Sequence, residues 1–182
     1  MRRTLLFVAL ACLSAWSYAD GFTLISPDIK ANGKIPKRFE YNGFGCSGEN
    51  RSPALQWSGA PKDTKSYAVT MYDPDAPTGS GWWHWIVINI PADVTELTAG
   101  AGALNSTLLP HGAVQGRSDF GTPAWGCTCP PQGDAPHRYI FTVYALKTGK
   151  LEVPADATAA LTGYMIHANT LGKASFTATY GR

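Results

Sequence analysis

The stretch "YDPDAPTGSGWWHWIVINIP" at residues 72–91 contains a proline-rich loop that leads into a strongly apolar segment. Pro74 and Pro77 fix their own φ angles and favour extended backbone in the preceding residues, so this loop is expected to be stiff. The segment "WIVINI" at 85–90 is apolar at almost every position. Such a pattern is typical of an interior strand that is covered on both faces. The stretch therefore predicts a polar loop at the end of a buried strand.

The rest of the chain predicts many short strands separated by turns. The segment "RYIFTVYAL" at 138–146 also lacks a polar face and is expected to be a second central strand. Between scattered glycines and prolines, further strands are expected at 22–25, 54–58, 67–72, 113–116 and 175–180, with a short edge strand at 38–41. This pattern indicates a mainly β domain, a β-sandwich of two packed sheets.

Helical signals are few. One helix is expected at 157–171, with Asp156 as its N-cap and Gly172 just past its end. A weaker signal for a short helix lies at 93–97. One or two helices would therefore lie at the periphery of the sandwich.

The first nineteen residues resemble an export signal. Arg2 and Arg3 precede an apolar run at 5–13, and "SYA" at 17–19 has the form of a signal peptidase site. We predict a signal peptide at 1–19 that is cleaved after Ala19, one domain at 20–182, and a periplasmic or secreted product. A lipoprotein anchored at Cys12 is a weaker alternative, because the preceding apolar run would be very short.

Cleavage would leave a domain without net charge. It removes two of the fifteen basic residues and none of the thirteen acidic ones, so the numbers of basic and acidic residues become equal. A neutral domain argues against a broad nucleic-acid or anionic-membrane surface. No segment after residue 20 is long and apolar enough for a transmembrane helix. We expect no cofactor and no stable membrane insertion.

Three cysteines would remain after export: Cys46, Cys127 and Cys129. Export permits a disulfide, and a bridge between Cys127 and Cys129 would be strained at that spacing. Cys46 is therefore expected to pair with Cys127 or with Cys129, while three free buried thiols are the alternative. A zinc site is disfavoured because the usual ligand spacing and a fourth ligand are missing.

Two loops bring polar side chains to the start of buried strands. His84 begins one strand and is expected to share a face with Trp82, while Trp83 and Trp85 share the other face. His137 and Tyr139, two residues apart, are expected to share a face of the second strand. Taken alone, a histidine of this kind is more often a satisfied core residue. Taken together, the two loops predict one site for a small anion with an apolar wall.

Other functions remain open from the residues alone. Asp73 or Asp75 with His84 could serve a hydrolase, although no G-x-S-x-G motif or activated nucleophile is present. Asp73, Asp75, His84 and His137 are possible metal ligands, but their spacing is not that of a zinc site. A protein-interaction or inhibitor module is a further alternative. We favour a ligand-binding protein over an enzyme.

Three motifs in this order resemble one known family. "YDPDAP", "HW" followed by "NIP", and "PPQGDAPHRY" are similar to the phosphatidylethanolamine-binding protein family, also called Raf-kinase-inhibitor-like. The phrases "DPDAPTGSGWWHW" and "GYMIHANTLGKASFTATY" are most similar to its bacterial YbhB/YbcL branch, and to exported YbcL-like members in particular. The resemblance covers nearly all of residues 22–180.

The resemblance implies a β-sandwich with a small pocket for phosphate, phosphorylated head groups or carboxylates. It implies that Asp73 orients the imidazole of His84, while His137 and Tyr139 donate to the anion. Asp75 would shape the turn. The resemblance implies that the pocket wall and rim consist of Ala76, Pro77, Trp82, Pro130 and Pro131.

Further implications concern the loop before the second strand. Backbone N–H groups near Cys127 and Cys129 would replace those of a glycine-rich loop in eukaryotic members, and "QGRSDFG" at 115–121 could brace that loop through Asp119. A Cys46–Cys129 disulfide is preferred, because the exported relatives carry this pair. The helix before the last strand implies a more open pocket than in eukaryotic members, and the bacterial relatives imply a homodimer. Modulation of a protein partner of unknown identity is a further expectation.

Overall fold

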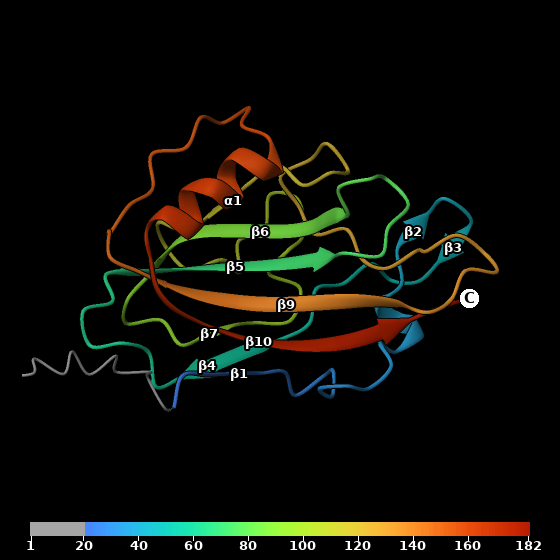
Figure 1. Cartoon of the computed structure of the whole chain (residues 1–182), viewed down its shortest axis with the longest axis horizontal. Coiled ribbons are helices and arrows are strands. Elements are labelled where there is room, and N and C mark those ends of the chain that lie inside the picture. The colour runs from blue at the N-terminus through green and yellow to red at the C-terminus, as the bar shows by residue number, and fades with distance from the viewer. Residues whose placement is uncertain (1–20) are drawn as a thin grey trace, which may run out of the picture.

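A computed structural model describes residues 21–182 and shows a mainly β architecture with one α-helix (Figure 1). The predicted signal peptide at 1–19 and the alternative lipid anchor at Cys12 lie outside the described residues. All peptide bonds within 21–182 are trans, including those before Pro74 and Pro77. No helix in this part of the chain is long and apolar enough to span a membrane.

The largest sheet has five antiparallel strands. Their spatial order is β10 (Thr170–Tyr180), β9 (His137–Leu146), β5 (Ser66–Asp73), β6 (Trp82–Pro91) and β8 (Val114–Gln115). Figure 1 shows the first four side by side. Most residues of β5, β6 and β9 are buried, because these strands have neighbours on both edges and cover on both faces. The two apolar segments at 85–90 and 138–146 are thus interior strands, as the sequence predicted.

A second sheet packs against one face of this sheet. It contains β1 (Thr23–Ile25), β4 (Leu55–Ser58) and β7 (Glu96–Leu97). Leu55 and Trp57 point from β4 into the main core, where they join Val69, Trp85 and Phe141 of the larger sheet. The expected sandwich of two packed sheets is therefore confirmed. A third, two-stranded sheet of β2 (Asn42–Gly43) and β3 (Cys46–Ser47) stands apart from both.

The helix α1 (Ala159–Ala168) covers the other face of the large sheet. A smaller core lies beneath it and includes Ile86 and Ile88 of β6 and Ile166 of the helix. The predicted bounds of 157–171 were too wide. The hydroxyl of Thr158, and not Asp156, accepts the capping hydrogen bond from the Leu161 amide at 3.1 Å. At the other end, residues 170–171 already belong to β10, because pairing with β9 competes with helix extension.

Two weaker predictions were wrong. Residues 38–41 were expected to form an edge strand, but Lys37–Phe39 form a 3-10 turn, η1, that begins after Pro36. The segment 93–97 was expected to be a short helix, but Glu96–Leu97 pair with β4. In both segments the local pattern was short, and tertiary contacts determine the conformation: Phe39 and Leu97 are both buried in the main core.

The start of β6 contains a β-bulge at His84. Met71 lies opposite Trp85, yet the next residue of β5, Tyr72, lies opposite Trp83, so His84 is the extra residue. The bulge breaks the alternation that predicted a shared face for the two flanking tryptophans. Trp85 enters the main core, whereas Trp83 packs toward α1 on the opposite face. That part of the prediction was wrong for this reason.

Candidate ligand-binding site

A cavity of about 290 Å³ lies where β5 ends and where β6 and β9 begin. Antiparallel neighbours bring these three strand ends together, so the two loops predicted from sequence meet at one place. The predicted residues that line the cavity are Asp73, Ala76, Pro77, Trp82, His84, Cys129, Pro130, Pro131, His137 and Tyr139. Its inner end contains buried residues, and its mouth contains exposed ones such as Pro77 and Pro131.

Asp73 holds His137 and not His84, contrary to the expected pairing. Its Oδ2 accepts a hydrogen bond from His137 Nδ1 at 2.8 Å, whereas His84 Nε2 lies 4.0 Å away. Its Oδ1 accepts from the backbone amides of Asp75 and Ala76 at 2.8 and 3.1 Å. Both oxygens are therefore satisfied, and Asp73 forms the turn that had been assigned to Asp75.

Asp75 instead joins the loop to β9. Its carboxylate accepts hydrogen bonds from the Arg138 guanidinium at 2.7 and 2.9 Å and from the Arg138 backbone amide at 2.8 Å. These hydrogen bonds hold the pKa of Asp75 down to about 2, against the opposing effect of burial. This ion pair lies outside the cavity. It fixes the loop relative to β9, the strand that carries His137.

His84 is a neutral imidazole with one free ring nitrogen. Its Nδ1 donates to the Gly126 carbonyl at 2.7 Å, which assigns the lone pair to Nε2. Burial lowers the pKa of His84 to about 4, although the carbonyl and the charge of Asp73 oppose this shift. At neutral pH, Nε2 is therefore a hydrogen-bond acceptor at the cavity wall.

His137 has the opposite protonation preference. Burial alone would lower the pKa of its imidazole, but the hydrogen bonds and charges of Asp73 and Asp134 together outweigh it, and the pKa is raised. Its Nε2 approaches Asp134 Oδ2 at 3.4 Å, which is long for a hydrogen bond. The Nε2–H group of His137 is therefore only weakly engaged by Asp134.

Three buried polar atoms at the cavity have no hydrogen-bond partner among the described residues: Trp82 Nε1, His84 Nε2 and Tyr139 Oη. Burial, with the nearby charge of Asp73, raises the pKa of Tyr139, so its hydroxyl remains a donor. Each buried polar atom without a partner costs about 1–3 kcal/mol. Two donors and one acceptor without partners thus belong to residues that line one cavity.

Cys127 does not line the cavity. Its side chain is fully buried, and its backbone amide already donates to Asn50 Oδ1 at 2.9 Å. Burial raises the pKa of the free Cys127 thiol to about 12, so it is no nucleophile at neutral pH. The expected amide donor at this position is used to hold the loop in place.

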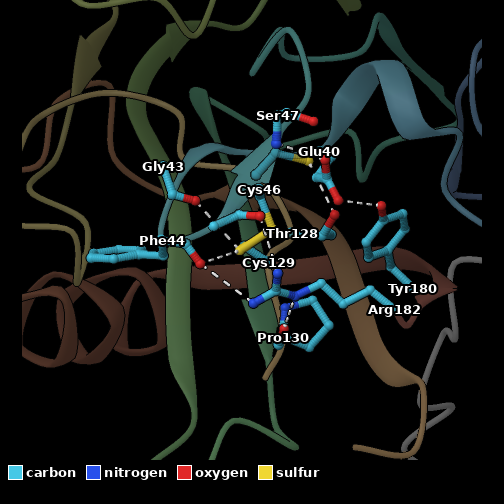
Figure 2. The surroundings of a disulfide bond; sticks show 12 residues. Glu40, Gly43, Phe44, Cys46, Ser47, Thr128, Cys129, Pro130, Tyr180 and Arg182 are labelled. Carbon is cyan, nitrogen blue, oxygen red and sulfur yellow. Dashed lines mark hydrogen bonds between the residues drawn. A yellow bond between two sulfur atoms is a disulfide. The ribbon is translucent and has the colours of Figure 1, made fainter. Parts of the chain in front are cut away.

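The predicted disulfide joins Cys46 to Cys129, with a Cα–Cα distance of 6.1 Å (Figure 2). It links the turn between β2 and β3 to the cavity wall formed by Cys129 and Pro130. No group of three or more His, Cys, Asp or Glu side chains within 21–182 is close enough to hold a metal ion.

Sequence reasoning missed four lining residues: Phe44, Thr78, Phe120 and Arg182. Arg182 donates to the carbonyls of Pro130, Gly45 and Phe44 at 2.7, 3.2 and 3.4 Å. Figure 2 shows its guanidinium beside the disulfide, where it joins the same two loops. No sequence motif indicated this role, because it depends on β10 ending beside residues far away in the chain.

Phe120 belongs to the segment 115–121, which was expected to hold the loop before β9 in place. Asp119 Oδ2 accepts from the Trp83 amide at 2.7 Å, so Asp119 does cap a backbone donor, but one of β6. The ring of Phe120 packs edge-on against His84 and Trp82. The segment thus contributes a side chain to the cavity itself.

The sequence model of the phosphatidylethanolamine-binding protein family matches residues 25–181. The chain belongs to this family. Among curated relatives of the family, YbcL from Escherichia coli strain K12 is 50% identical over 180 residues, covering 99% of this chain and 98% of the relative. YbhB from the same strain is 46% identical over 157 residues, covering 86% and 98%.

Solved structures agree with this family membership. The crystal structure of E. coli YbcL, described as a new member of the mammalian PEBP family, superposes with a TM-score of 0.87 at 53% identity, covering 89% of this chain and 99% of YbcL. A homologue of phosphatidylethanolamine-binding proteins from Chlamydia trachomatis gives 0.73 at 30% identity, covering 89% and 98%. The resemblance noted in the sequence is therefore confirmed, and the chain is a binding protein of this family.

Proposed function

We propose that the cavity binds a small anion of the phosphate type, either free or as the head group of a phosphorylated or carboxylate-bearing molecule. The three buried polar atoms without partners carry this proposal, since a ligand that accepts from Trp82 and Tyr139 and donates to His84 would satisfy them all. A monoprotonated phosphate group offers both acceptors and one donor.

The charges around the cavity support an anion. Asp73 lies 2.8 Å from His137, whose pKa it raises, and this contact offsets the charge of the carboxylate at the cavity. Arg182 lines the cavity, and within the described chain its guanidinium meets only backbone carbonyls. Its positive charge is not compensated by a carboxylate in contact and would attract a negative ligand.

Calorimetry tests this proposal with inorganic phosphate, phosphoethanolamine and acetate. Tyr139→Phe removes one donor and keeps the ring, and we expect it to weaken phosphate binding about tenfold, as loss of a hydrogen bond to a charged group does. Tyr72→Phe is the matched control, because that hydroxyl donates to the Ser80 carbonyl and not into the cavity. Equal affinities of wild type and Tyr139→Phe would contradict the proposed site.

We propose binding without turnover. The carboxylate of Asp73 is fully hydrogen-bonded, and the Cys127 thiol is buried away from the cavity, so neither is a free nucleophile. Hydrolysis of p-nitrophenyl phosphate or acetate that disappears in both His84→Ala and Asp73→Ala would instead favour an enzyme.

Export is also part of the proposal. The Cys46–Cys129 disulfide is compatible with an oxidising compartment. Mass spectrometry of the purified mature protein tests it: an N-terminus at Asp20 is expected, whereas a lipidated Cys12 would support the alternative anchor.

The homodimer expected from the sequence remains a prediction. The helix α1 exposes Leu161 and Tyr164, which are 44% and 68% exposed and offer an apolar surface to a second copy. Light scattering after size exclusion tests it, and a monomeric mass at high protein concentration would contradict it.

A further inference from the structure

The β2–β3 turn, residues 42–47, forms part of the cavity wall but belongs to neither of the two packed sheets. Within the described chain its two-residue strands pair only with each other, and a lone two-stranded hairpin is marginally stable. Phe44 at its tip lines the cavity and is 74% exposed. The position of this wall therefore depends on contacts with other parts of the protein.

The base of the turn is anchored in the interior. The buried carboxylate of Glu40 accepts hydrogen bonds from the Ser47 amide at 2.9 Å and from the Tyr180 hydroxyl at 2.7 Å. The Tyr41 amide donates to the Thr128 carbonyl at 3.0 Å. Hydrogen bonds to an ionised carboxylate are strong, and none of these bonds involves the tip, residues 43–45. Both ends of the turn therefore stay in place if the tip moves.

A disulfide restrains the tip. The bond from Cys46 to Cys129 joins the end of the turn to the cavity wall (Figure 2). Arg182 adds hydrogen bonds to the carbonyls of Phe44 and Gly45, at 3.4 and 3.2 Å, but water competes for both because they are exposed. The covalent bond is therefore the main restraint.

The backbone of the tip favours release. Phe44 has a φ of 52°, a left-handed conformation that is unfavourable for a residue with a side chain. Its neighbours Gly43 and Gly45 have no Cβ and reach other conformations easily. The Phe44 ring stacks on Tyr41 and Phe120 at centroid distances of 5.6 and 6.2 Å, which opposes release. A restraint such as the disulfide can then decide the conformation of the tip.

The tip is linked to the cation of the cavity. Two of the three carbonyls that hold the Arg182 guanidinium belong to the tip, and the third is that of Pro130. Arg182 lines the cavity, where its charge would attract a negative ligand. Movement of the tip would therefore change the position of this charge.

We propose that the Cys46–Cys129 disulfide is a redox latch: the oxidised protein holds the tip closed, and reduction releases the tip and weakens ligand binding. The effect on binding rests on the proposed anion site. Since binding and reduction are then linked, a bound anion makes the disulfide harder to reduce by the same factor by which reduction weakens binding.

The reductant is a dithiol that enters through the cavity mouth. Cys129 lines the cavity and is partly exposed, whereas Cys46 is buried. One thiolate of the dithiol attacks Cys129 Sγ, the disulfide bond breaks, and Cys46 leaves as a thiolate that takes up a proton. The second thiol then displaces Cys129. The protein thus gains two electrons and two protons, and the dithiol becomes a disulfide.

The first test asks whether reduction opens the tip without unfolding the domain. Protein reduced with dithiothreitol and desalted without oxygen is compared with the oxidised protein by hydrogen exchange. We expect residues 43–46 to exchange faster after reduction, while β5 and β9 stay protected after these residues have exchanged completely. Unchanged exchange at 43–46 would overturn the latch, and so would equal loss of protection in β5 and β9.

The second test measures binding of inorganic phosphate by calorimetry. We expect the reduced protein to bind about two- to fivefold more weakly, as loss of a partly screened charge contact does, and reoxidation to restore the affinity. Saturating phosphate should lower the equilibrium constant for reduction by dithiothreitol by the same factor, measured by thiol alkylation and intact mass. Cys127→Ala is the matched control and should respond as the wild type does, because this thiol lies outside the disulfide.

The outcomes separate this inference from the proposed function. If both forms bind phosphate equally, redox control is excluded and the anion site stands. If the oxidised protein binds no phosphate, the anion site fails, while hydrogen exchange still decides whether the disulfide holds the tip. A redox response that disappears in Cys127→Ala would assign it to the free thiol and overturn the latch.

Discussion

At the scale of single residues, the pKa values of the two cavity histidines shift in opposite directions. His84 is bonded to a neutral carbonyl, so burial dominates and its pKa falls to about 4. Burial also lowers the pKa of His137, but its hydrogen bonds and charge interactions with Asp73 and Asp134 together outweigh burial, and its pKa rises. Burial and the partners of each ring therefore act together to set the direction of its pKa shift.

This difference predicts how stability depends on pH. The pKa of His137 is raised on folding, so its pairing with Asp73 stabilises the protein fully below the unfolded-state pKa of about 6.5. The stabilisation is lost as pH rises through the higher folded-state pKa. We expect His137→Asn to flatten the fall in unfolding free energy over the pH range from about 6.5 upward. Urea titrations over this range provide the measurement.

The control for this prediction is His111→Asn, since His111 is an exposed loop residue. Its stability profile should match that of the wild type. A profile of His137→Asn that retains the full alkaline fall would show that another group causes the dependence.

The sequence predicted the histidines and Asp73 as neighbours, but not which ring the carboxylate holds. β5 lies between β6 and β9, so Asp73 has a histidine-bearing strand on each side. The choice depends on strand register: Tyr72 pairs with Ile140 of β9 directly, while the bulge in β6 displaces His84. Register and bulges depend on tertiary packing and leave no reliable signal in single residues.

At the scale of elements, the bulge in β6 and the loop that holds it form one unit. The Gly126 amide donates to the His84 carbonyl at 3.1 Å, and the Gly126 carbonyl accepts from the His84 ring. The close approach depends on the missing side chain, because a Cβ on Gly126 would lie 2.4 Å from Phe120 Cδ2. The glycine therefore permits Phe120 to pack on His84.

We expect Gly126→Ala to displace the Phe120 ring and to lower the unfolding free energy by about 1–3 kcal/mol, as overpacking does. Binding of phosphate should weaken as well, because the wall beside His84 moves. Chemical denaturation and calorimetry measure the two effects. Gly149→Ala is the control, since a Cβ there meets nothing within 4 Å and should change neither quantity.

At the scale of the whole molecule, two links fasten the β2–β3 turn to the cavity wall: the disulfide and the Arg182 guanidinium. The disulfide joins residues 83 positions apart, and such long closures typically stabilise by about 2–4 kcal/mol. We expect Cys46→Ala with Cys129→Ala to lose that amount in urea unfolding and to weaken ligand binding at the mouth.

Cys127→Ala is the control for this double variant, because its thiol is free and outside the cavity. It should bind ligand as the wild type does and should lose less stability than the double variant. If the double variant retained wild-type stability and affinity, the disulfide would have no role in holding the turn.

The sandwich and its two interior strands followed from the apolar pattern of the sequence, while most of the cavity residues followed from the resemblance of its motifs to a known family. The ends of α1 and the contribution of Arg182 did not follow. Residues 170–171 suit a helix locally and leave it only because β9 offers a pairing edge. Arg182 reaches Phe44 only through the full topology. Long-range contacts of this kind are invisible to local patterns.

The cavity is lined by residues from position 44 to position 182, on strands and loops from most of the chain. The site is intact only when all of these segments are folded. A ligand therefore binds only the globally folded state and shifts the whole unfolding equilibrium. At a hundred times its dissociation constant, a ligand adds about 2.7 kcal/mol. For a domain of this size the melting temperature should rise by roughly 5–10 °C. A thermal-shift screen of phosphorylated compounds can therefore identify the natural ligand.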